Sequence, residues 1–431
     1  MDWKKLLGSS LTSYHTVENA AEMLKSCGFS EWKEYEGAEF QVGGKYFTVR
    51  DGSALIAFSV GSGHYGYRIV ASHTDSPCLK LKANPERRDK HYVTLNAESY
   101  GGGIYYSFLD RPLKIAGRIV AEQGGVIRTR VVESSETVVI PSVAIHFNRE
   151  VNQGIALKVQ TDLQPLAGSD QELNVAARIA SAYFEGEYRL LDYDLYVCSA
   201  QEPFLCGFGG EYLCAPGIDN RTSVFASVGA LCGLREHSGI AMCYLADNEE
   251  VGSATKQGAG SLFLADTIRR INRALGYSAD QLDCALAESF LVSADNAHAA
   301  HPNHAELSDP TNRVYPNEGI VVKHHANQNY TTDAVSSAIF RSICERAGVP
   351  VQDFYMNSNL RCGGTLGAIS SGRLSVRSVD IGLAQLAMHS AVEMLGVKDL
   401  EYMERGLRAF YESDIHESAQ GIRITGSSEG K

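Results

Sequence analysis

Two adjacent glutamates follow a strongly apolar segment near the middle of the chain. The segment 240–246 has the sequence IAMCYLA, and Asp247, Asn248, Glu249 and Glu250 come directly after it. Such a pair is most often a solvated turn. In a metal-dependent hydrolase, however, one carboxylate can bind the metal while the other takes a proton from water, if an extended backbone turns the two side chains apart. The pair by itself leaves both interpretations open.

Other histidines and carboxylates stand at or beside the ends of apolar segments: His73, Asp75, Asp219, Asp295 and His389. Each has an ordinary explanation when taken alone, as a polar turn, a helix cap or a surface histidine. Taken together, they form a mixed set of imidazole and carboxylate ligands. Such a set suits Zn²⁺, Mn²⁺ or Co²⁺ better than a thiolate-preferring or all-oxygen site does. A dinuclear metal site is therefore a hypothesis, and the ordinary explanations remain open.

The second half of the chain alternates between predicted strands and helices. We expect strands at 239–247, 284–295, 318–325, 349–356 and 373–382, and helices at 221–234, 261–276, 331–348 and 383–396, the last containing His389. This alternation predicts an α/β fold with a mixed central sheet and helices on both faces. Ligands of such sheets bind beyond the carboxyl ends of the strands, where the polar residues stand.

The first half of the chain has a different texture. A helix at 15–29 with Thr16 as its N-cap, a hairpin at 45–61 that turns at Asp51 and Gly52, and a strand at 67–73 are expected. Strand-like segments then dominate, at 91–99, 113–122, 125–134 and 136–147, with some helical character at 171–184. We therefore expect a discontinuous catalytic domain, 1–78 and 199–431, interrupted by an inserted β-rich domain, 79–198.

Composition narrows the class of protein. The formal net charge of −12 argues against a general nucleic-acid binder and against binding to an anionic membrane. No stretch approaches 18 apolar residues, and the start of the chain lacks the pattern of a signal peptide. The ten cysteines form no CxxC pair, so we expect free thiols and a cytoplasmic location. The tail 425–431 is expected to be disordered.

Several motifs resemble those of the aspartyl aminopeptidase family, whose members are cocatalytic zinc metallopeptidases. In chain order they are SHTDSP, GIDNRTS, DNEEVGS, SADNAHAAHPNH, KHHANQNYTTDAV and RCGGTLG. DNEEVGS alone also suits related metalloaminopeptidases, whereas NAHAAHPN together with ANQNYTTDA is more specific. The match runs from near Tyr14 to about residue 410. The resemblance implies a zinc-exopeptidase type of fold with an inserted all-β dimerisation domain, assembled from dimers into a dodecameric homo-oligomer.

The resemblance also implies two divalent metal ions per subunit, zinc first, with manganese or cobalt as possibilities. His73 and Asp295 would hold one ion, Glu250 and His389 the other, and Asp219 would bridge both. Glu249 would be the general base that activates a metal-bridging water. Asp75 would orient the ring of His73, and the Asp219–Asn220 peptide would be cis.

Three further residues would contact the substrate by the same resemblance. Lys323 and Tyr330 would line the pocket. His146 would reach an active site, that of a neighbouring subunit, with a direct metal role as the less favoured alternative.

These roles imply a metalloaminopeptidase that removes the N-terminal residue of peptides. An acidic N-terminal residue is the expected preference, because Lys323 would pair with its side chain. Gly364, His325 and Asn329 depart from the residues usual in the family and leave this preference open. One alternative is a dinuclear hydrolase of the same fold with broad or neutral aminopeptidase or deacylase specificity. A remote alternative is a non-catalytic scaffold, which predicts a lost ligand or base, although all of these residues are present.

Overall fold

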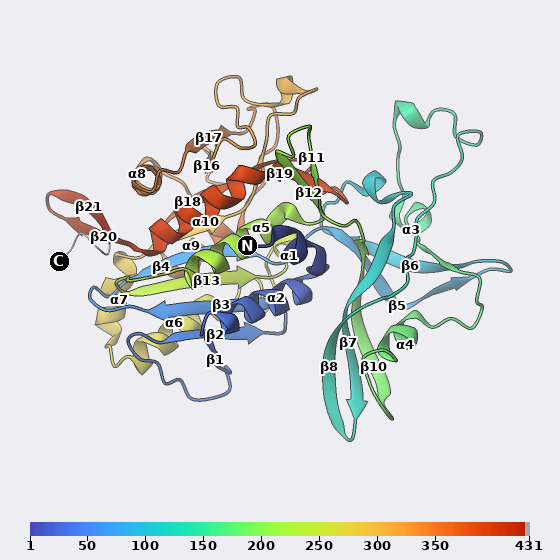
Figure 1. The fold of residues 1–431 in the computed structure, drawn as a ribbon, viewed down its shortest axis with the longest axis horizontal. Coiled ribbons are helices and arrows are strands. Elements are labelled where there is room, and N and C mark those ends of the chain that lie inside the picture. Colours follow the sequence, from blue (N-terminus) through green and yellow to red (C-terminus); the bar gives the residue numbers. More distant parts are fainter. Residues whose placement is uncertain (427–431) are drawn as a thin grey trace.

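The computed structural model describes residues 1–426 and contains two large sheets (Figure 1). The larger sheet has thirteen strands. Ten follow one path: β1 (Ser30–Glu31), β2 (Lys45–Arg50), β3 (Ala54–Val60), β13 (Ile240–Ala246), β4 (Tyr67–His73), β14 (Phe290–Ala294), β18 (Arg377–Leu386), β19 (Glu393–Gly396), β12 (Tyr212–Ala215) and β11 (Phe204–Cys206). Off this path, β15 (Ala297–His298) and β16 (Ile320–His324) pair with β18, and β17 (Val351–Tyr355) pairs with β16.

The centre of this sheet is parallel. β13 and β14 both run parallel to β4, and β18 runs parallel to β14. In this register Ala246 lies opposite His73, and Ala294 lies opposite Ile381. The carboxyl ends of the central strands therefore meet at one edge of the sheet, which brings the residues that follow them together.

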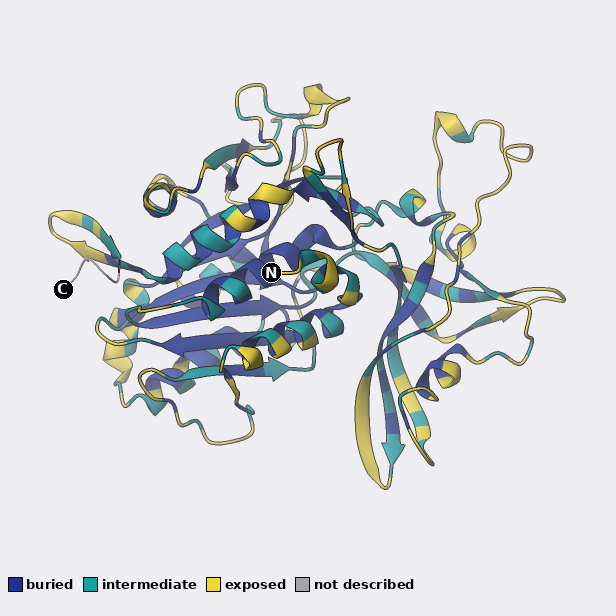
Figure 2. Ribbon diagram, in the orientation of Figure 1, coloured by how far each residue is buried: buried dark blue, intermediate teal, exposed yellow. Residues whose placement is uncertain are grey.

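Helices cover both faces of the larger sheet. One face carries α1 (Trp3–Ser9), α2 (Ser13–Ser26), α5 (Ile218–Cys232), α8 (Ala334–Arg346) and α10 (Val397–Tyr411), and the other carries α6 (Phe263–Ala274), α7 (Ala279–Ala287) and α9 (Leu366–Leu374). Alternate residues of a strand point to opposite faces, so Cys243 of β13 packs into the first core and Tyr244 into the second. The central strands are buried on both faces for this reason (Figure 2). The predicted α/β fold with helices on both faces is confirmed.

The second sheet is antiparallel and lies to one side of the first (Figure 1). Its six strands, in spatial order, are β8 (Val126–Glu133), β7 (Leu113–Gln123), β10 (Arg189–Ser199), β5 (Cys78–Arg88), β6 (Val93–Tyr100) and β9 (Leu166–Gly168). The short helices α3 (Val159–Asp162) and α4 (Val175–Ala180) belong to the same part of the chain, and α4 contributes to its separate core. A final hairpin, β20 (Ser413–Ser418) and β21 (Gly421–Gly426), follows α10.

Two predicted elements near the functional residues are wrong. Residues 383–396 do not form the final helix, because β18 continues to Leu386 and β19 begins at Glu393. Ala387 and His389 adopt positive φ angles of 55° and 68° in the turn between them. The last helix is α10 instead. Residues 136–147 do not form a strand either: Val138 and Ile140 make isolated bridges.

Smaller corrections concern element boundaries. Thr12, not Thr16, is the N-cap residue of α2, since the Thr16 hydroxyl donates to the carbonyl of Thr12 within the helix. Residues 284–287 belong to α7 and not to the strand that follows. Of the predicted disordered tail, residues 425 and 426 belong to β21, and 427–431 lie outside the described residues.

Two other expectations agree with the structure. The hairpin turns at Asp51 and Gly52, both with positive φ. All ten cysteines are free thiols. Across residues 1–426, no helix combines the length and the apolar character that crossing a bilayer requires.

Candidate metal centre

The strand ends bring together the residues that sequence analysis singled out. His73 is the last residue of β4, Asp295 follows β14, and Asp219 lies in the first turn of α5. Glu249 and Glu250 open a short 3-10 turn, η3 (Glu249–Val251), just after β13. His389 completes the set from the turn between β18 and β19.

Two triads of possible metal ligands share Asp219. His73, Asp219 and Asp295 form one, and Asp219, Glu250 and His389 form the other, with ligand atoms within 4.8 Å of one another in each. His73 Nε2 lies 3.6 Å from Asp219 Oδ1 and 3.5 Å from Asp295 Oδ1. His389 Nε2 lies 3.4 Å from Asp219 Oδ2 and 3.3 Å from Glu250 Oε1. Each oxygen of Asp219 therefore faces a different triad.

The donor set fits divalent metal ions. Asp219 Oδ1 and Glu250 Oε1 are buried and have no hydrogen-bond partner among the described residues, an arrangement that is costly without a cation. Burial lowers the pKa of His389, but the contacts with Asp219 and Glu250 outweigh it and raise the pKa to about 11. The pocket therefore favours positive charge, which a metal ion would supply in place of the imidazole proton.

Asp75 organises both the histidine and the pair of glutamates. His73 Nδ1 lies 3.4 Å from Asp75 Oδ1 and 3.1 Å from the Asp75 carbonyl oxygen. The backbone amides of Glu249 and Glu250 donate to Asp75 Oδ1 and Oδ2, each at 3.1 Å. The expectation of an extended backbone at the two glutamates is wrong, because both lie in the 3-10 turn. Successive side chains there diverge by about 120°, which also separates the pair.

Glu249 lies beside one ligand of each triad. One of its carboxylate oxygens lies within 4.8 Å of ligand atoms of His73 and Glu250. Burial raises the pKa of Glu249 to about 8, His73 opposes the shift, and Asp295 adds to it. Glu249 lies beside possible metal ligands but belongs to neither of the two triads that share Asp219. Such a carboxylate is suited to accept a proton from water.

Three supporting residues were not identified from the sequence. The carboxylate of Glu393 accepts hydrogen bonds from the backbone amides of Asp219, at 2.9 Å, and His389, at 2.6 Å. The hydroxyl of Tyr100 donates to Asp75 Oδ2 at 2.8 Å. The side-chain amide of Asn296 donates to Gln385 Oε1 at 2.7 Å, among other partners. A lone glutamate inside the apolar segment 383–396 was the one available signal for Glu393.

The predicted substrate residues lie beside the first triad. Lys323 is 2% exposed, and its ammonium lies 3.6 Å from Asp295 Oδ2 and donates to the carbonyl of Asn296 at 3.2 Å. Tyr330 is buried, and its ring centroid lies 4.9 Å from Lys323 Nζ. Lys323 thus already has a carboxylate partner. At Gly364, an added Cβ would meet no atom within 4 Å.

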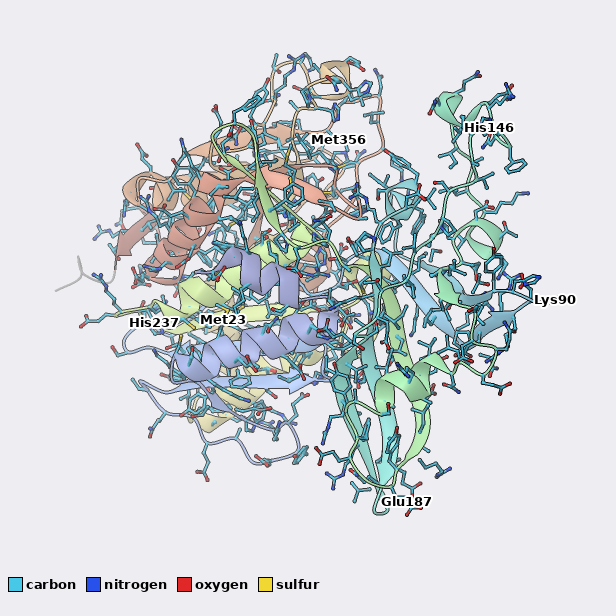
Figure 3. All side chains as sticks on the ribbon, turned by 45° about the vertical axis from the view of Figure 1, so that its right-hand side comes forward. Met23, Lys90, His146, Glu187, His237 and Met356 are labelled. Carbon is cyan, nitrogen blue, oxygen red and sulfur yellow. The ribbon has the colours of Figure 1, made fainter. Side chains whose placement is uncertain are left out.

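His146 is not part of this group. It lies on an outlying loop beside the second sheet (Figure 3), and that loop exposes Val143, Ile145 and Phe147. The predicted cis geometry of the Asp219–Asn220 peptide is present.

Comparisons with known proteins show to which family the chain belongs. The family model for the aminopeptidase I zinc metalloprotease family (M18) matches residues 6–411. A "Probable M18 family aminopeptidase 2" of Clostridium novyi (strain NT) is 38% identical over 416 residues, 93% of this chain and 96% of the relative. A "Probable aspartyl aminopeptidase" of Ricinus communis is 32% identical over an alignment of 467 residues. The alignment covers 96% of this chain and 95% of the relative.

Solved structures share the fold over most of its length. The chain in the cryo-EM structure of the Ape4 and Nbr1 complex superposes with a TM-score of 0.91 at 32% identity, covering 95% of this chain and 84% of that one. A chain of the S. cerevesiae mApe1 dodecamer superposes with a TM-score of 0.82 at 26% identity, covering 95% of this chain and 95% of that one. The chain therefore belongs to the M18 family of aminopeptidases, which are zinc-dependent hydrolases.

Proposed function

We propose that the chain is a dinuclear zinc aminopeptidase in which Asp219 is shared between two metal ions. The observation that carries this proposal is the pair of triads that meet at the two oxygens of Asp219. His73 and Asp295 complete one site, and Glu250 and His389 complete the other. Two divalent ions, zinc or else manganese or cobalt, would lower the pKa of a water and polarise the scissile carbonyl when bound.

The remaining steps belong to the protein's own residues. Glu249 takes the proton of the attacking water and returns it to the departing amine nitrogen. Asp75 holds the ring of His73 and the turn that carries both glutamates. The carboxylate of Glu393 fixes the backbone of Asp219 and of His389 through two hydrogen bonds. Positioning by buried hydrogen bonds keeps these groups in place before the substrate arrives.

Metal dependence has a direct test. Dialysis against a chelator should abolish hydrolysis of aminoacyl substrates, and zinc should restore it with about two ions bound at the active site of each subunit. Full activity of protein that elemental analysis finds free of metal would overturn the proposal.

We further propose a preference for acidic N-terminal residues, with Lys323 as the group that recognises the side-chain carboxylate. The name of the aspartyl aminopeptidase relative supports the acidic preference. A charge-assisted hydrogen bond contributes about 1.5–3 kcal/mol, so Lys323→Met should reduce kcat/KM for aspartyl substrates about 10- to 150-fold more than for leucyl substrates. The leucyl substrate controls for general damage from the lost contact with Asp295.

One observation favours the alternative of broad or neutral specificity. Lys323 is already paired with Asp295 and with the carbonyl of Asn296, which satisfies its charge without a substrate. A panel of Asp, Glu, Leu and Lys aminoacyl substrates beside N-acyl amino acids separates the possibilities. Equal rates on Asp and Leu substrates would replace the acidic preference, and hydrolysis of the acylated compounds alone would indicate a deacylase.

We also propose that residues 79–198 form an inserted dimerisation domain within a catalytic domain of 1–78 and 199–431, and that the subunits form a dodecamer. The mApe1 dodecamer supports the assembly, and the exposed apolar residues around His146 support a subunit contact there. The free cysteines suit the cytoplasm as the compartment.

His146 would then act in the site of a neighbouring subunit. Chains with Glu249→Gln and chains with His146→Ala should each be inactive alone. Co-assembled in equal amounts, they should recover up to about a quarter of wild-type activity, because random neighbours rebuild some sites. Chains that carry both substitutions provide the control when mixed with Glu249→Gln chains. No recovery in a mixed dodecamer would exclude this role.

A further inference from the structure

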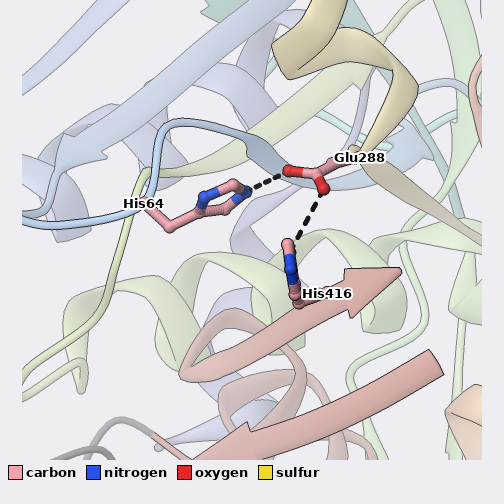
Figure 4. A group of neighbouring side chains, drawn as sticks. All are labelled: His64, Glu288 and His416. Carbon is pink, nitrogen blue, oxygen red and sulfur yellow. Dashed lines mark ion pairs between the residues drawn. The ribbon is translucent and has the colours of Figure 1, made fainter. Parts of the chain in front are cut away.

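A second cluster of possible metal ligands lies away from the site described above. His64, Glu288 and His416 place one ligand atom each within 4.8 Å of one another. Figure 4 shows the two imidazole rings next to the Glu288 carboxylate, each paired with a different oxygen. His416 Nδ1 lies 3.2 Å from Glu288 Oε1, and His64 Nε2 is in closer contact with Glu288 Oε2. The ring centroids are 5.7 Å apart.

The three residues come from separate parts of the chain. His64 lies in the loop before β4, Glu288 is the C-cap of α7 just before β14, and His416 lies in β20 of the last hairpin. The cluster therefore stands at the amino ends of β4 and β14, whereas His73 and Asp295 stand at their carboxyl ends. A strand of the length of β4 spans about 20 Å at about 3.3 Å per residue. The two groups are thus separate sites joined by the same strands.

The backbone around the cluster is held rigidly. The buried guanidinium of Arg68 donates to the carbonyls of Glu288, at 3.1 Å, Ser413, at 3.2 Å, and Ile415, at 3.1 Å. Arg68 also pairs with Asp414 at 3.5 Å. One side chain thus fixes both the segment that carries Glu288 and the strand that carries His416, and Asp414 offsets its positive charge. Preorganised ligands of this kind favour metal binding.

His64 provides an independent observation. Its Nε2 is buried from solvent but has no hydrogen-bond partner among the described residues, although it contacts the carboxylate of Glu288. The nitrogen is therefore close to the oxygen without the geometry of a hydrogen bond. A cation between the three side chains would satisfy this atom.

We propose that His64, Glu288 and His416 bind a divalent zinc ion that fastens the C-terminal hairpin to the larger sheet. Two imidazoles and one carboxylate are a ligand set that zinc accepts, with water in the fourth position. The side chains of Glu288 and His416 are 26% and 57% exposed, which leaves room for that water and for the small movements that bring all three ligands to bonding distance. The ion would join the loop before β4, the end of α7 and β20.

The test compares zinc content among full-length proteins. His416→Ala and Glu288→Gln remove one ligand each, and His91→Ala removes an exposed histidine in the turn between β5 and β6 as a matched control. At a buffered low free-zinc concentration, the two cluster variants should hold about one zinc per subunit fewer than the wild type and His91→Ala. Zinc affinity at the lost site should fall by at least about tenfold. Aminopeptidase activity should stay within about twofold of the wild type in all four proteins.

Equal zinc content in the four proteins would overturn the proposal. The comparison does not depend on how many ions the active site holds, because loss of those ions would lower all four values equally and would remove activity. Crystals of the wild type soaked in zinc give a second measurement that does not require a variant to fold. Anomalous density at the zinc edge between the three side chains is expected, and its absence at saturating zinc would refute the site.

Hydrogen exchange tests the fastening role. Zinc should slow exchange of the backbone amides of β20 and β21 in the wild type and in His91→Ala, but not in His416→Ala. Unchanged exchange in the wild type would show that the ion does not fasten the hairpin and would overturn that part of the proposal.

Discussion

Substitution of Asp75 by asparagine should disable the candidate centre without removing any of its ligands. The carboxylate of Asp75 accepts three hydrogen bonds and lies near a fourth donor, the ring of His73. Oδ1 faces the Glu249 amide at 3.1 Å and His73 Nδ1 at 3.4 Å, and Oδ2 faces the Glu250 amide at 3.1 Å and the Tyr100 hydroxyl at 2.8 Å. Asparagine keeps the shape but replaces one oxygen by an amino group that can only donate.

Neither orientation of the asparagine satisfies these donors. With its nitrogen in the place of Oδ1, the amide of Glu249 loses its acceptor and the ring of His73 keeps only the Asp75 carbonyl. With its nitrogen in the place of Oδ2, the amide of Glu250 and the hydroxyl of Tyr100 lose theirs. Each unpaired buried donor costs about 1–3 kcal/mol, so the folded site loses about 1–3 kcal/mol even in the less costly orientation, which leaves the Glu249 amide unpaired. We expect kcat/KM to fall about 30-fold, which corresponds to about 2 kcal/mol, and zinc affinity to fall 10- to 100-fold.

Tyr100→Phe is the matched control. It removes one donor to Oδ2 and leaves both backbone amides paired, so it should cost about 1 kcal/mol and no more than about fivefold in kcat/KM. Steady-state hydrolysis of aminoacyl substrates, chelator competition for zinc and urea unfolding measure the three quantities. An Asp75→Asn protein with kcat/KM and zinc affinity within twofold of the wild type would refute the role of the carboxylate. Equal damage in Tyr100→Phe would assign the effect to the hydroxyl instead.

Three further predictions concern individual side chains. Glu249→Gln should abolish turnover while zinc stays bound, whereas Glu250→Gln should weaken zinc binding; equal zinc loss in both, by elemental analysis, would contradict this division. Glu393→Gln should weaken zinc binding about tenfold without touching a ligand, because its amino group would face the amide of Asp219 or His389; unchanged affinity in a chelator titration would count against it. Burial lowers the pKa of His15 to about 4, so the unfolded state binds its proton first as the pH falls. Stability from this group is complete above about pH 6.5 and is lost, by up to about 3 kcal/mol, between pH 6.5 and 4; urea unfolding of His15→Gln should show this part of the pH dependence removed.

The central strands could be predicted from the sequence because their burial is uniform. β4, β13 and β14 are buried on both faces, so short, mostly apolar segments ending in polar residues identify them. The segment 383–396 misled for the opposite reason. Its Leu, Ala, Gln and Met residues favour a helix, but pairing of Leu383 with β16 and of Gln385 with β19 overrides that preference. Local propensity carries no information about such partners.

The functional residues also fall into two groups, those that the sequence predicts and those that only the tertiary fold identifies. The residue types of the proposed ligands, and their places after apolar segments, are visible in the sequence. Their supporting contacts are not: Asp219 and Glu393 are joined by a hydrogen bond across 174 residues, and Tyr100 reaches Asp75 from the second sheet. His64 and His416 likewise approach Glu288 from distant segments. Chemistry at strand ends can thus be predicted, whereas the groups that position it depend on the tertiary fold.

The carboxylates concentrated at one edge of the larger sheet need neighbouring groups that stabilise their negative charge. Asp75, Asp219, Glu250, Asp295 and Glu393 are gathered with few cations to balance them, and burial raises the pKa of Glu393 to about 8. Buried negative charge of this density opposes folding unless protons, hydrogen-bond donors or metal ions offset it. The donors come from rigid backbone: the amides at 219, 249, 250 and 389 all point to carboxylates. The backbone segments around these strand ends therefore supply fixed dipoles in addition to metal ligands. These dipoles stabilise the unbalanced negative charge before a metal ion binds.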